Sequence, residues 1–297
     1  MTIQATDGFL IVDKAGAMTS HDVVAIGRRA LNTRKVGHAG TLDPMATGVL
    51  VLGFGNGTRL LQYITDGDKS YSATVVLGAS TVTDDAEGEV LGWATPASIS
   101  QISDEEITSE LAKMHGVIQQ RPSSVSAIKV DGQRAHARVR SGEEFELPAR
   151  EVTISQLEVK QIRHLEGRIE VDIDVTCSAG TFIRAIARDC GIALGIGGHL
   201  SALRRTRVAS FTLEGATTVP ELKDGGFHTL SITEVAQSIF PFREVSEQEA
   251  TDLSFGRALA TNGSDAITAA IGHGQLLALL ENKDGLARPI AVFAAKN

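Results

Sequence analysis

The chain has 297 residues, a formal net charge of −8, and 42% hydrophobic and 22% charged residues. This length suggests two domains, or one large domain with an appendage, and the composition is ordinary for a globular protein. No stretch approaches the roughly 18 consecutive apolar residues of a membrane-spanning helix, and we expect no secretory leader. The two cysteines, Cys177 and Cys190, match no zinc or redox spacing, so we expect buried thiols in a protein of the reducing cytoplasm.

The negative charge is concentrated in one segment. Residues 80–118 hold eight acidic residues and one lysine, a net charge of −7, which leaves −1 for the rest of the chain. Basic residues cluster at 28–35, 119–140 and 204–207, and arginine outnumbers lysine 19 to 9. Arginine forks suit phosphate contacts. Charge alone therefore leaves two interpretations open, a nucleic-acid partner or a set of solvated helix faces.

Apolar spacing and turn residues predict the elements of the first half of the chain. In chain order they are a strand at 9–12, a helix at 22–31 capped by Ser20, a glycine-punctuated loop at 37–44, a strand at 49–52, a helix at 58–64 and a strand at 70–77.

The second half predicts more strands than helices. In chain order we expect a helix near 104–115, a tight turn at Asp131-Gly132, a hairpin of strands at 152–162 and 168–177, a helix at 181–194, and then a helix at 246–253 with strands at 276–280 and 289–293. Strands and helices follow no repeating βαβ rhythm. We therefore predict an α+β fold with a mixed, largely antiparallel sheet and a small β-rich domain from about residue 240.

Two common kinds of site are not favoured by the sequence. The run Gly53–Gly57 reads G-x-G-x-G between a strand and a helix, and it matches neither the dinucleotide nor the phosphate-loop fingerprint. We interpret it as a tight turn. The eight histidines form no H-E-x-x-H or paired H-x₃-H cluster, and Asp84, Asp85 and Glu87 lack the calcium-loop pattern. We expect no metal and no nucleotide cofactor.

Three residues are candidates for a functional role on their local sequence alone. Asp43 follows a loop whose glycines and proline specify an unusual backbone, although a plain Asp-Pro turn would explain it too. Arg184 lies in the first turn of a predicted helix, where the macrodipole disfavours a cation, and its neighbours one turn away cannot neutralise it. It is either solvated or paired with an acid from elsewhere. Tyr71, at a strand start, is either a core residue or a ring that stacks on a base.

Several long motifs occur in order over about residues 8–210. They are Asp13-Lys14 with Gly16 and Thr19-Ser20, residues 37–48 around Asp43, Lys69-Ser70-Tyr71, Thr83-Asp84-Asp85 with Glu87-Gly88, Arg121-Pro122-Ser123 through Lys129-Val130 and Gly132, residues 177–184 around Arg184, and His199-Leu200 with Leu203-Arg204-Arg205. Together they resemble the motifs of the TruB family of tRNA pseudouridine synthases.

The resemblance implies an isomerase that converts a uridine in the tRNA T-loop, conventionally position 55, to pseudouridine without a cofactor. It implies a catalytic domain over 1–239 with an RNA-gripping insertion at about 119–150, and an RNA-binding PUA-like domain over 240–297. We expect a cytoplasmic monomer whose partner is the T-arm and elbow of tRNA. The alternative is a non-catalytic RNA-binding or tRNA-folding protein on the same scaffold.

The resemblance also implies roles for individual residues. Asp43 would be the nucleophile, attacking either C1′ of the sugar or C6 of the base, Arg184 its ion-pair partner, and Tyr71 a ring stacked on the uracil that assists removal of the C5 proton. His38 would fill the space left by the flipped nucleotide, and Phe182, where many members have Tyr, would line the pocket with Leu203. The predicted RNA contacts are Lys14, Lys129, Arg204 and Arg205.

The uneven charge leads to one more expectation. We predict a basic cleft around Asp43 and an acidic surface turned away from the tRNA. Because Asp84 and Asp85 belong to a motif near the cleft, part of the acidic segment is a candidate for shaping the site.

Overall fold

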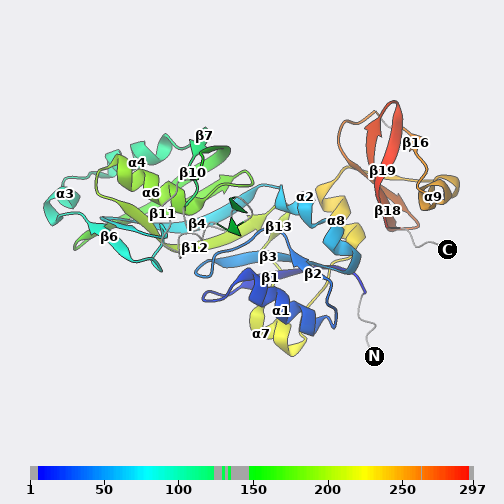
Figure 1. The fold of residues 1–297 in the computed structure, drawn as a ribbon, viewed down its shortest axis with the longest axis horizontal. Coiled ribbons are helices and arrows are strands. Elements are labelled where there is room, and N and C mark those ends of the chain that lie inside the picture. The colour runs from blue at the N-terminus through cyan, green and yellow to red at the C-terminus, as the bar shows by residue number, and fades with distance from the viewer. Residues whose placement is uncertain (1–5, 124–128, 131–132, 135–146, 262, 294–297) are drawn as a thin grey trace. The chain divides into compact units, whose positions relative to one another are not determined.

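The computed structural model describes residues 6–123, 129–130, 133–134, 147–261 and 263–293 (Figure 1). The chain divides into two compact units. Unit 1 comprises residues 1–42, 49–65 and 209–297, and unit 2 comprises residues 43–48 and 66–208. The three predicted catalytic residues, Asp43, Tyr71 and Arg184, therefore all belong to unit 2.

Unit 2 is built on an antiparallel sheet with the order β12-β4-β11-β10-β7. Its strands are β4 (Lys69–Leu77), β7 (Gly116–Gln120), β10 (Arg150–Leu165), β11 (Arg168–Cys177) and β12 (Gly198–Val208). Along β11, residues 169, 171, 173, 175 and 177 are buried and their neighbours are not, as the alternation of apolar residues predicts. The predicted hairpin and the predicted α+β class are confirmed.

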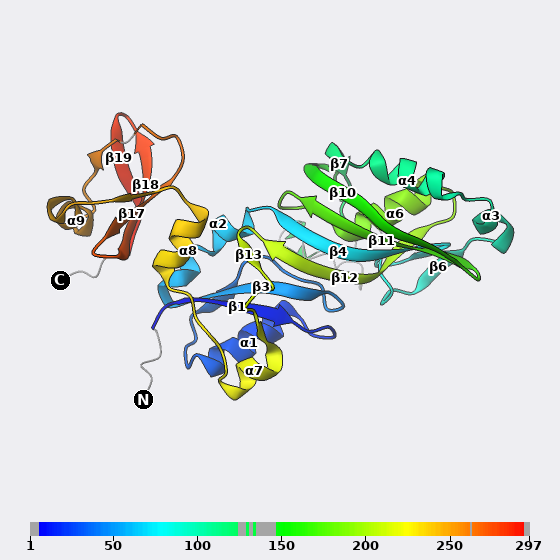
Figure 2. The ribbon, with the colours of Figure 1, turned by 180° about the vertical axis from the view of Figure 1, so that it is seen from behind.

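Helices cover one face of this sheet. Helix α6 (Ile183–Ala193) packs on β12 and β4, and α4 (Asp104–Ala112) packs on α6 and β10 (Figures 1 and 2). The buried side chains of α6 include Ile186 and Cys190, which face the sheet core. The remaining elements of unit 2 are the short helix α3 (Pro96–Ser100), the hairpin of β5 (Ala79–Thr81) and β6 (Val90–Trp93), and the pair β8 (Lys129–Val130) and β9 (Gln133–Arg134). The predicted turn at Asp131-Gly132 lies outside the described residues.

Unit 1 contains a small mixed sheet flanked by helices. Its strands are β1 (Gly8–Lys14), β2 (Val36–His38), β3 (Thr47–Phe54) and β14 (Thr217–Thr218), and unit 1 also contains the short strand β13 (Phe211–Thr212). Strand β1 pairs in parallel with β14, and β2 pairs antiparallel with β3. Its helices are α1 (Ser20–Ala30), α2 (Leu61–Thr65), α7 (Val219–Asp224) and α8 (Ile232–Ile239).

Two local predictions in unit 1 are corrected. The helix expected at 58–64 is a 3₁₀ turn over Gly55–Arg59 followed by α2, because the glycines near Gly57 favour a tight turn over a regular helix. The cap of α1 is Thr19, whose hydroxyl accepts from the Asp22 amide while the Asp22 carboxylate accepts from the Thr19 amide. Ser20, predicted as the cap, is the first helical residue, and its hydroxyl instead bonds the backbone of Leu42.

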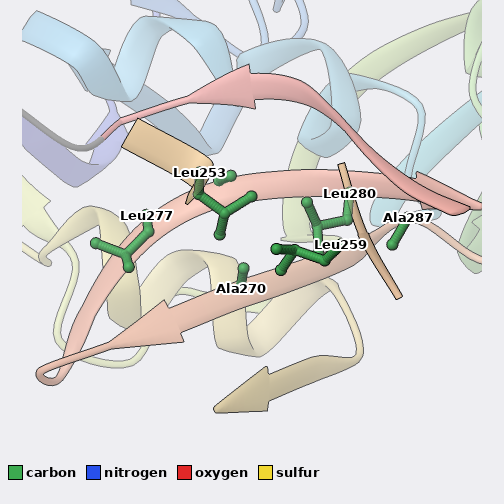
Figure 3. Close-up of a cluster of buried hydrophobic side chains, with 7 residues drawn as sticks. Leu253, Leu259, Ala270, Leu277, Leu280 and Ala287 are labelled. Carbon is green, nitrogen blue, oxygen red and sulfur yellow. The ribbon is translucent and has the colours of Figure 1, made fainter. Parts of the chain in front are cut away.

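The C-terminal residues of unit 1 form a separate five-stranded sheet in the order β15-β17-β18-β19-β16. Its elements are β15 (Phe242–Glu244), α9 (Glu247–Ser254), β16 (Leu259–Ala260), β17 (Thr268–Gly272), β18 (Gln275–Lys283) and β19 (Leu286–Val292). Figure 3 shows its core, in which Leu253 of α9 and Leu280 of β18 are almost completely buried. The predicted β-rich segment from about residue 240 is confirmed.

Candidate active site

Arg184 and Asp43 meet in unit 2. The Nε atom of Arg184 lies 2.9 Å from Oδ2 of Asp43, and the side chain of Arg184 is 5% exposed while that of Asp43 is 35% exposed. The acid that the local sequence around Arg184 left open is therefore Asp43, the partner that the family resemblance implies. The buried guanidinium of Arg184 thus holds the partly exposed carboxylate of Asp43 in place.

A second acid holds Arg184 from the other side. Its Nη1 lies 3.4 Å from Oδ2 of Asp85 and donates to the Thr83 carbonyl at 2.5 Å. Asp85 is itself fixed, because its Oδ1 accepts from the Thr83 hydroxyl at 2.5 Å and from the Glu87 amide at 3.0 Å. A buried guanidinium requires such compensation. Two acids and one carbonyl explain how a cation is accommodated in the first turn of α6.

The acidic segment continues this arrangement one helical turn further along α6. Arg188 Nη1 lies 3.1 Å from Oδ2 of Asp84, and its Nη2 donates to the Arg121 carbonyl at 2.7 Å. Burial raises the pKa of the Asp84 carboxyl, and the nearby Arg188 and Arg184 offset part of that rise. The candidate role of Asp84 and Asp85 in shaping the site thus agrees with the geometry. The sequence did not reveal Arg188 as the partner of Asp84.

Tyr71 pairs with Arg205. The two residues are opposite one another on β4 and β12, and both are buried, with 8% and 1% exposure. Their side chains are hydrogen-bonded. Burial raises the pKa of the Tyr71 hydroxyl to about 12, even though the positive charge of Arg205 opposes the rise. The phenol is therefore protonated at neutral pH.

Gly48 allows β3, the strand that follows Asp43 in the chain, to approach β12. Thr47 and Gly48 run parallel to Arg204 and Arg205. Gly48 has a φ of 102°, and a Cβ there would lie 2.1 Å from the Arg205 carbonyl oxygen. Only glycine fits this position. The close approach ties the Asp43 loop to the strand that carries Arg205.

An open pocket of about 500 Å³ lies on the sheet of unit 2. It includes Met45 and Thr47, just beyond Asp43 in the chain, and two predicted substrate-binding residues, Leu203 and Arg204. Its other lining residues are Ser72, Ala73, Thr74, Lys160, Asp172, Ile173, Asp174, Ser201 and Ala202. Arg204 is oriented by a hydrogen bond of 3.2 Å from its Nη1 to the Thr47 hydroxyl. The pocket brings these two predicted residues together, whereas Asp43 is not part of its lining.

The structure places the other predicted binding residues in different surroundings. Lys14 is completely buried, and its Nζ donates to the carbonyls of Ala15 and Met18. The His38 ring makes an edge contact with His21, with ring centroids 5.5 Å apart. Lys129 belongs to β8, and its side chain lies outside the described part of the chain.

The loop that precedes Asp43 is anchored by Ser20. The Ser20 hydroxyl accepts from the Leu42 amide at 2.8 Å and donates to the Leu42 carbonyl at 3.2 Å. We expect Ser20→Ala to lower stability by about 1–3 kcal/mol, because both backbone groups lose a buried partner. We also expect turnover to fall about tenfold, because the residue before Asp43 is released. Thermal unfolding and single-turnover rates would measure the two effects.

Thr19→Ala is the matched control for that prediction. It removes the α1 cap, at about 1 kcal/mol, and leaves the Leu42 contacts in place. Turnover in this variant is expected to stay within about twofold of the wild type. Equal losses of turnover in the two variants would contradict the anchoring role of Ser20.

The titration of Tyr71 provides another test. In a Tyr63→Phe background Tyr71 is the only tyrosine, and its phenolate absorbance should appear with a midpoint of about 12 instead of the usual 10.0. Because the folded state keeps the proton longer than the unfolded state, the associated stability is present below about pH 10 and is lost as the pH rises towards 12. Circular dichroism recorded on the same samples would show whether the chain is still folded. A midpoint near 10 in folded protein would contradict the buried environment.

Among the residues that the structure describes, no group of three or more His, Cys, Asp or Glu side chains is arranged to hold a metal ion. Within the same residues, every helix is too short or too polar to cross a membrane.

Comparisons with known proteins define the class. Residues 28–183 match the family described as "TruB family pseudouridylate synthase (N terminal domain)", residues 184–239 match "tRNA pseudouridylate synthase B C-terminal domain", and residues 240–294 match "tRNA Pseudouridine synthase II, C terminal". A chain in the "Crystal Structure of a Cbf5-Nop10-Gar1 Complex" has the same fold, with a TM-score of 0.72 at 24% identity over 99% of this chain and 87% of that one. The fold is that of pseudouridine synthases, with a PUA-like C-terminal domain.

Curated relatives are similar over nearly their whole length. The "tRNA pseudouridine synthase B" of Corynebacterium diphtheriae is 48% identical over 98% of this chain and 97% of that protein. The protein of the same name from Rhodococcus jostii is 53% identical over 96% of this chain and 93% of that protein. The chain therefore belongs to the TruB family of pseudouridine synthases, as its motifs indicate.

Proposed function

We propose that this protein converts uridine 55 in the T-loop of tRNA to pseudouridine, with Asp43 as the nucleophile. The observation that carries the proposal is the ion pair in which buried Arg184 holds the partly exposed carboxylate of Asp43 at 2.9 Å. A carboxylate presented in this way can attack an electrophilic carbon. The relatives named tRNA pseudouridine synthase B support tRNA as the substrate.

The reaction needs no net reactant besides the RNA. The N1–C1′ bond breaks, a C5–C1′ bond forms, C5 loses a proton and N1 gains one. Asp43 attacks either C1′ or C6 to allow the uracil to turn over. The nucleotide must first leave the base stack, because its reacting atoms are inaccessible there.

Tyr71 and Arg205 are assigned a shared role in this proposal. A phenol with a pKa of about 12 is protonated at neutral pH, so Tyr71 would stack its ring on the uracil. To take the C5 proton, its hydroxyl would have to give its own proton to water in the same step. The burial of Arg205 favours its partnership with Tyr71 over a phosphate contact. Phe182 and Leu203 would line the pocket that receives the flipped nucleotide, whereas the role proposed for His38 is to fill the space that this nucleotide leaves.

The proposal is tested by mapping pseudouridine in an unmodified tRNA after incubation with the protein. A transcript with uridine only at position 55 of its T-loop should be modified there, and a U55→C transcript should not. The reaction should proceed in buffer that contains EDTA and no nucleotide. Pseudouridine at another position, or none at all, would overturn the assignment.

Arg204 is proposed to contact an RNA phosphate, since it lines the open pocket. We expect Arg204→Gln to weaken tRNA binding and to reduce the slope of log K against log salt by about one. Arg168→Gln is the control, because Arg168 is a half-exposed arginine of the same unit that pairs with Glu170 outside the pocket. Dissociation constants for tRNA measured from low to moderate salt would give the slope for each variant. An unchanged slope in Arg204→Gln would show that this residue is structural.

A further inference from the structure

Gln120 forms an unusual buried contact with the start of α6. It is the last residue of β7 and is 1% exposed. Its Nε2 donates to the Phe182 carbonyl at 3.0 Å, and its Oε1 accepts from the Phe182 amide at 2.8 Å. One carboxamide thus satisfies both backbone groups of the residue that caps α6, which has no side-chain cap of its own.

Arg150 holds the same segment from the neighbouring strand. It is the first residue of β10 and lies directly opposite Gln120 in the sheet. Its guanidinium lies 4.8 Å from the centre of the Phe182 ring and donates to the Gly180 carbonyl. Burial lowers the pKa of Arg150, which shows that its charge is partly removed from water. We call the pair Gln120 and Arg150 the α6 clamp.

The clamp acts two residues before Arg184. The guanidinium of Arg184 must lie within hydrogen-bond distance of both Asp43 and Asp85, so a small rotation or shift of the first helical turn would misplace it. A misplacement of about 1 Å can cost about 100-fold in rate. We propose that Gln120 and Arg150 are positioning residues, which fix the start of α6 so that Arg184 presents Asp43 to the substrate. This inference rests on the proposed function of Asp43.

The chemistry of the contact requires a neutral amide. Gln120 must donate and accept at once, which glutamate cannot do when ionised and methionine cannot do at all. Without Gln120 the Phe182 amide would lose this partner in a partly buried place, and the Phe182 carbonyl would keep only the Ala185 amide at 3.2 Å, which would loosen the first turn of α6. The two clamp residues also stand at the ends of the strands joined by residues 121–149, the segment that resembles an RNA-gripping insertion.

The first experiment compares Gln120→Met with Gln119→Met. Gln119 is the preceding residue of β7 and is exposed, so its variant is a matched control. For Gln120→Met we expect a single-turnover rate about 10- to 100-fold below wild type, with the tRNA dissociation constant changed less than about twofold. Gln119→Met should match wild type in both. An unchanged rate in folded Gln120→Met would overturn the proposal.

A double-mutant cycle separates positioning from general stability. If Gln120 acts through Arg184, its replacement in an Arg184→Lys background should slow the residual reaction by less than about threefold. If Gln120→Met lowered the rate by the same factor in the wild-type and Arg184→Lys backgrounds, the proposal would be overturned. Should Gln120→Met fail to fold, Arg150→Met, which removes the ring contact from a half-exposed position, takes its place in both measurements.

Amide hydrogen exchange tests the clamp without any activity. In Gln120→Met, the amides at the start of α6 should exchange at least about tenfold faster than in Gln119→Met, with the rest of the helix protected equally. If the wild type proved inactive and Gln120→Met still exchanged faster than Gln119→Met, the proposed function would be refuted and the clamp would stand. Equal exchange in both variants would refute the clamp itself.

Discussion

Asp43→Asn is expected to abolish conversion of uridine to pseudouridine, with a loss of about 1,000-fold or more in the single-turnover rate. The amide has nearly the same shape as the carboxylate but cannot act as the nucleophile. Binding of tRNA should change less than about threefold, because Asp43 is a single side chain in a large interface. Quantifying pseudouridine by mass spectrometry, alongside filter binding, measures both quantities.

Folding should survive that substitution. Asp43 is 35% exposed, and Arg184 keeps Asp85 and the Thr83 carbonyl as partners. Asp104→Asn, at an exposed acid of the same unit that pairs with His164, is the control and should retain full activity. Substantial activity in Asp43→Asn would refute the nucleophile. Only an inactive wild type would favour the rival interpretation, a non-catalytic RNA-folding protein.

Arg184→Lys is expected to reduce the rate by about 100-fold or more while the charge is kept. A guanidinium reaches Asp43 with Nε and both Asp85 and Thr83 with Nη1, and a single ammonium cannot occupy both places. Stability should fall by about 2–4 kcal/mol, since Asp85 would be left buried with an imperfect partner. Rates measured below the unfolding temperature of the variant separate the two effects.

Arg188→Lys is the matched control for this prediction. Arg188 lies one turn further along α6 and pairs with Asp84 and Asp189, without a contact to Asp43. Its replacement should cost stability and leave the rate within about fivefold of wild type. A near-normal rate in Arg184→Lys, or an equal loss in both variants, would contradict a specific role for the Arg184 fork.

The sequence predicted the sheet of unit 2 well because its signal is local. The alternation along β11 fixes which side chains are buried, and two neighbouring strands joined by a short turn pair with each other. The cap of α1 was missed by one residue, because Thr19 and Ser20 are both good caps and only the reciprocal bond to Asp22 decides between them. The segment around Gly57 was missed because a single tight turn interrupts an otherwise helical pattern.

The site was predictable only as separate residues. The sequence showed that Arg184 lacks a local partner, but its acids lie far away in the chain at Asp43 and Asp85. Gln120 gave no signal at all, since one glutamine at a strand end is ordinary until the fold brings Phe182 to it. Such contacts depend on tertiary packing, which periodicity and turn propensities do not specify.

The residues of the two units alternate along the chain, which limits the ways in which gene rearrangement can separate them. Asp43, the proposed nucleophile, lies in residues 43–48, which belong to unit 2 but are flanked in sequence by residues of unit 1 on both sides. No single cut in the gene separates the two units, and a fragment that begins at residue 66 would inherit Tyr71 and Arg184 without Asp43. Exchange of one contiguous gene segment therefore cannot transfer Asp43, Tyr71 and Arg184 together without also transferring residues 49–65 of unit 1.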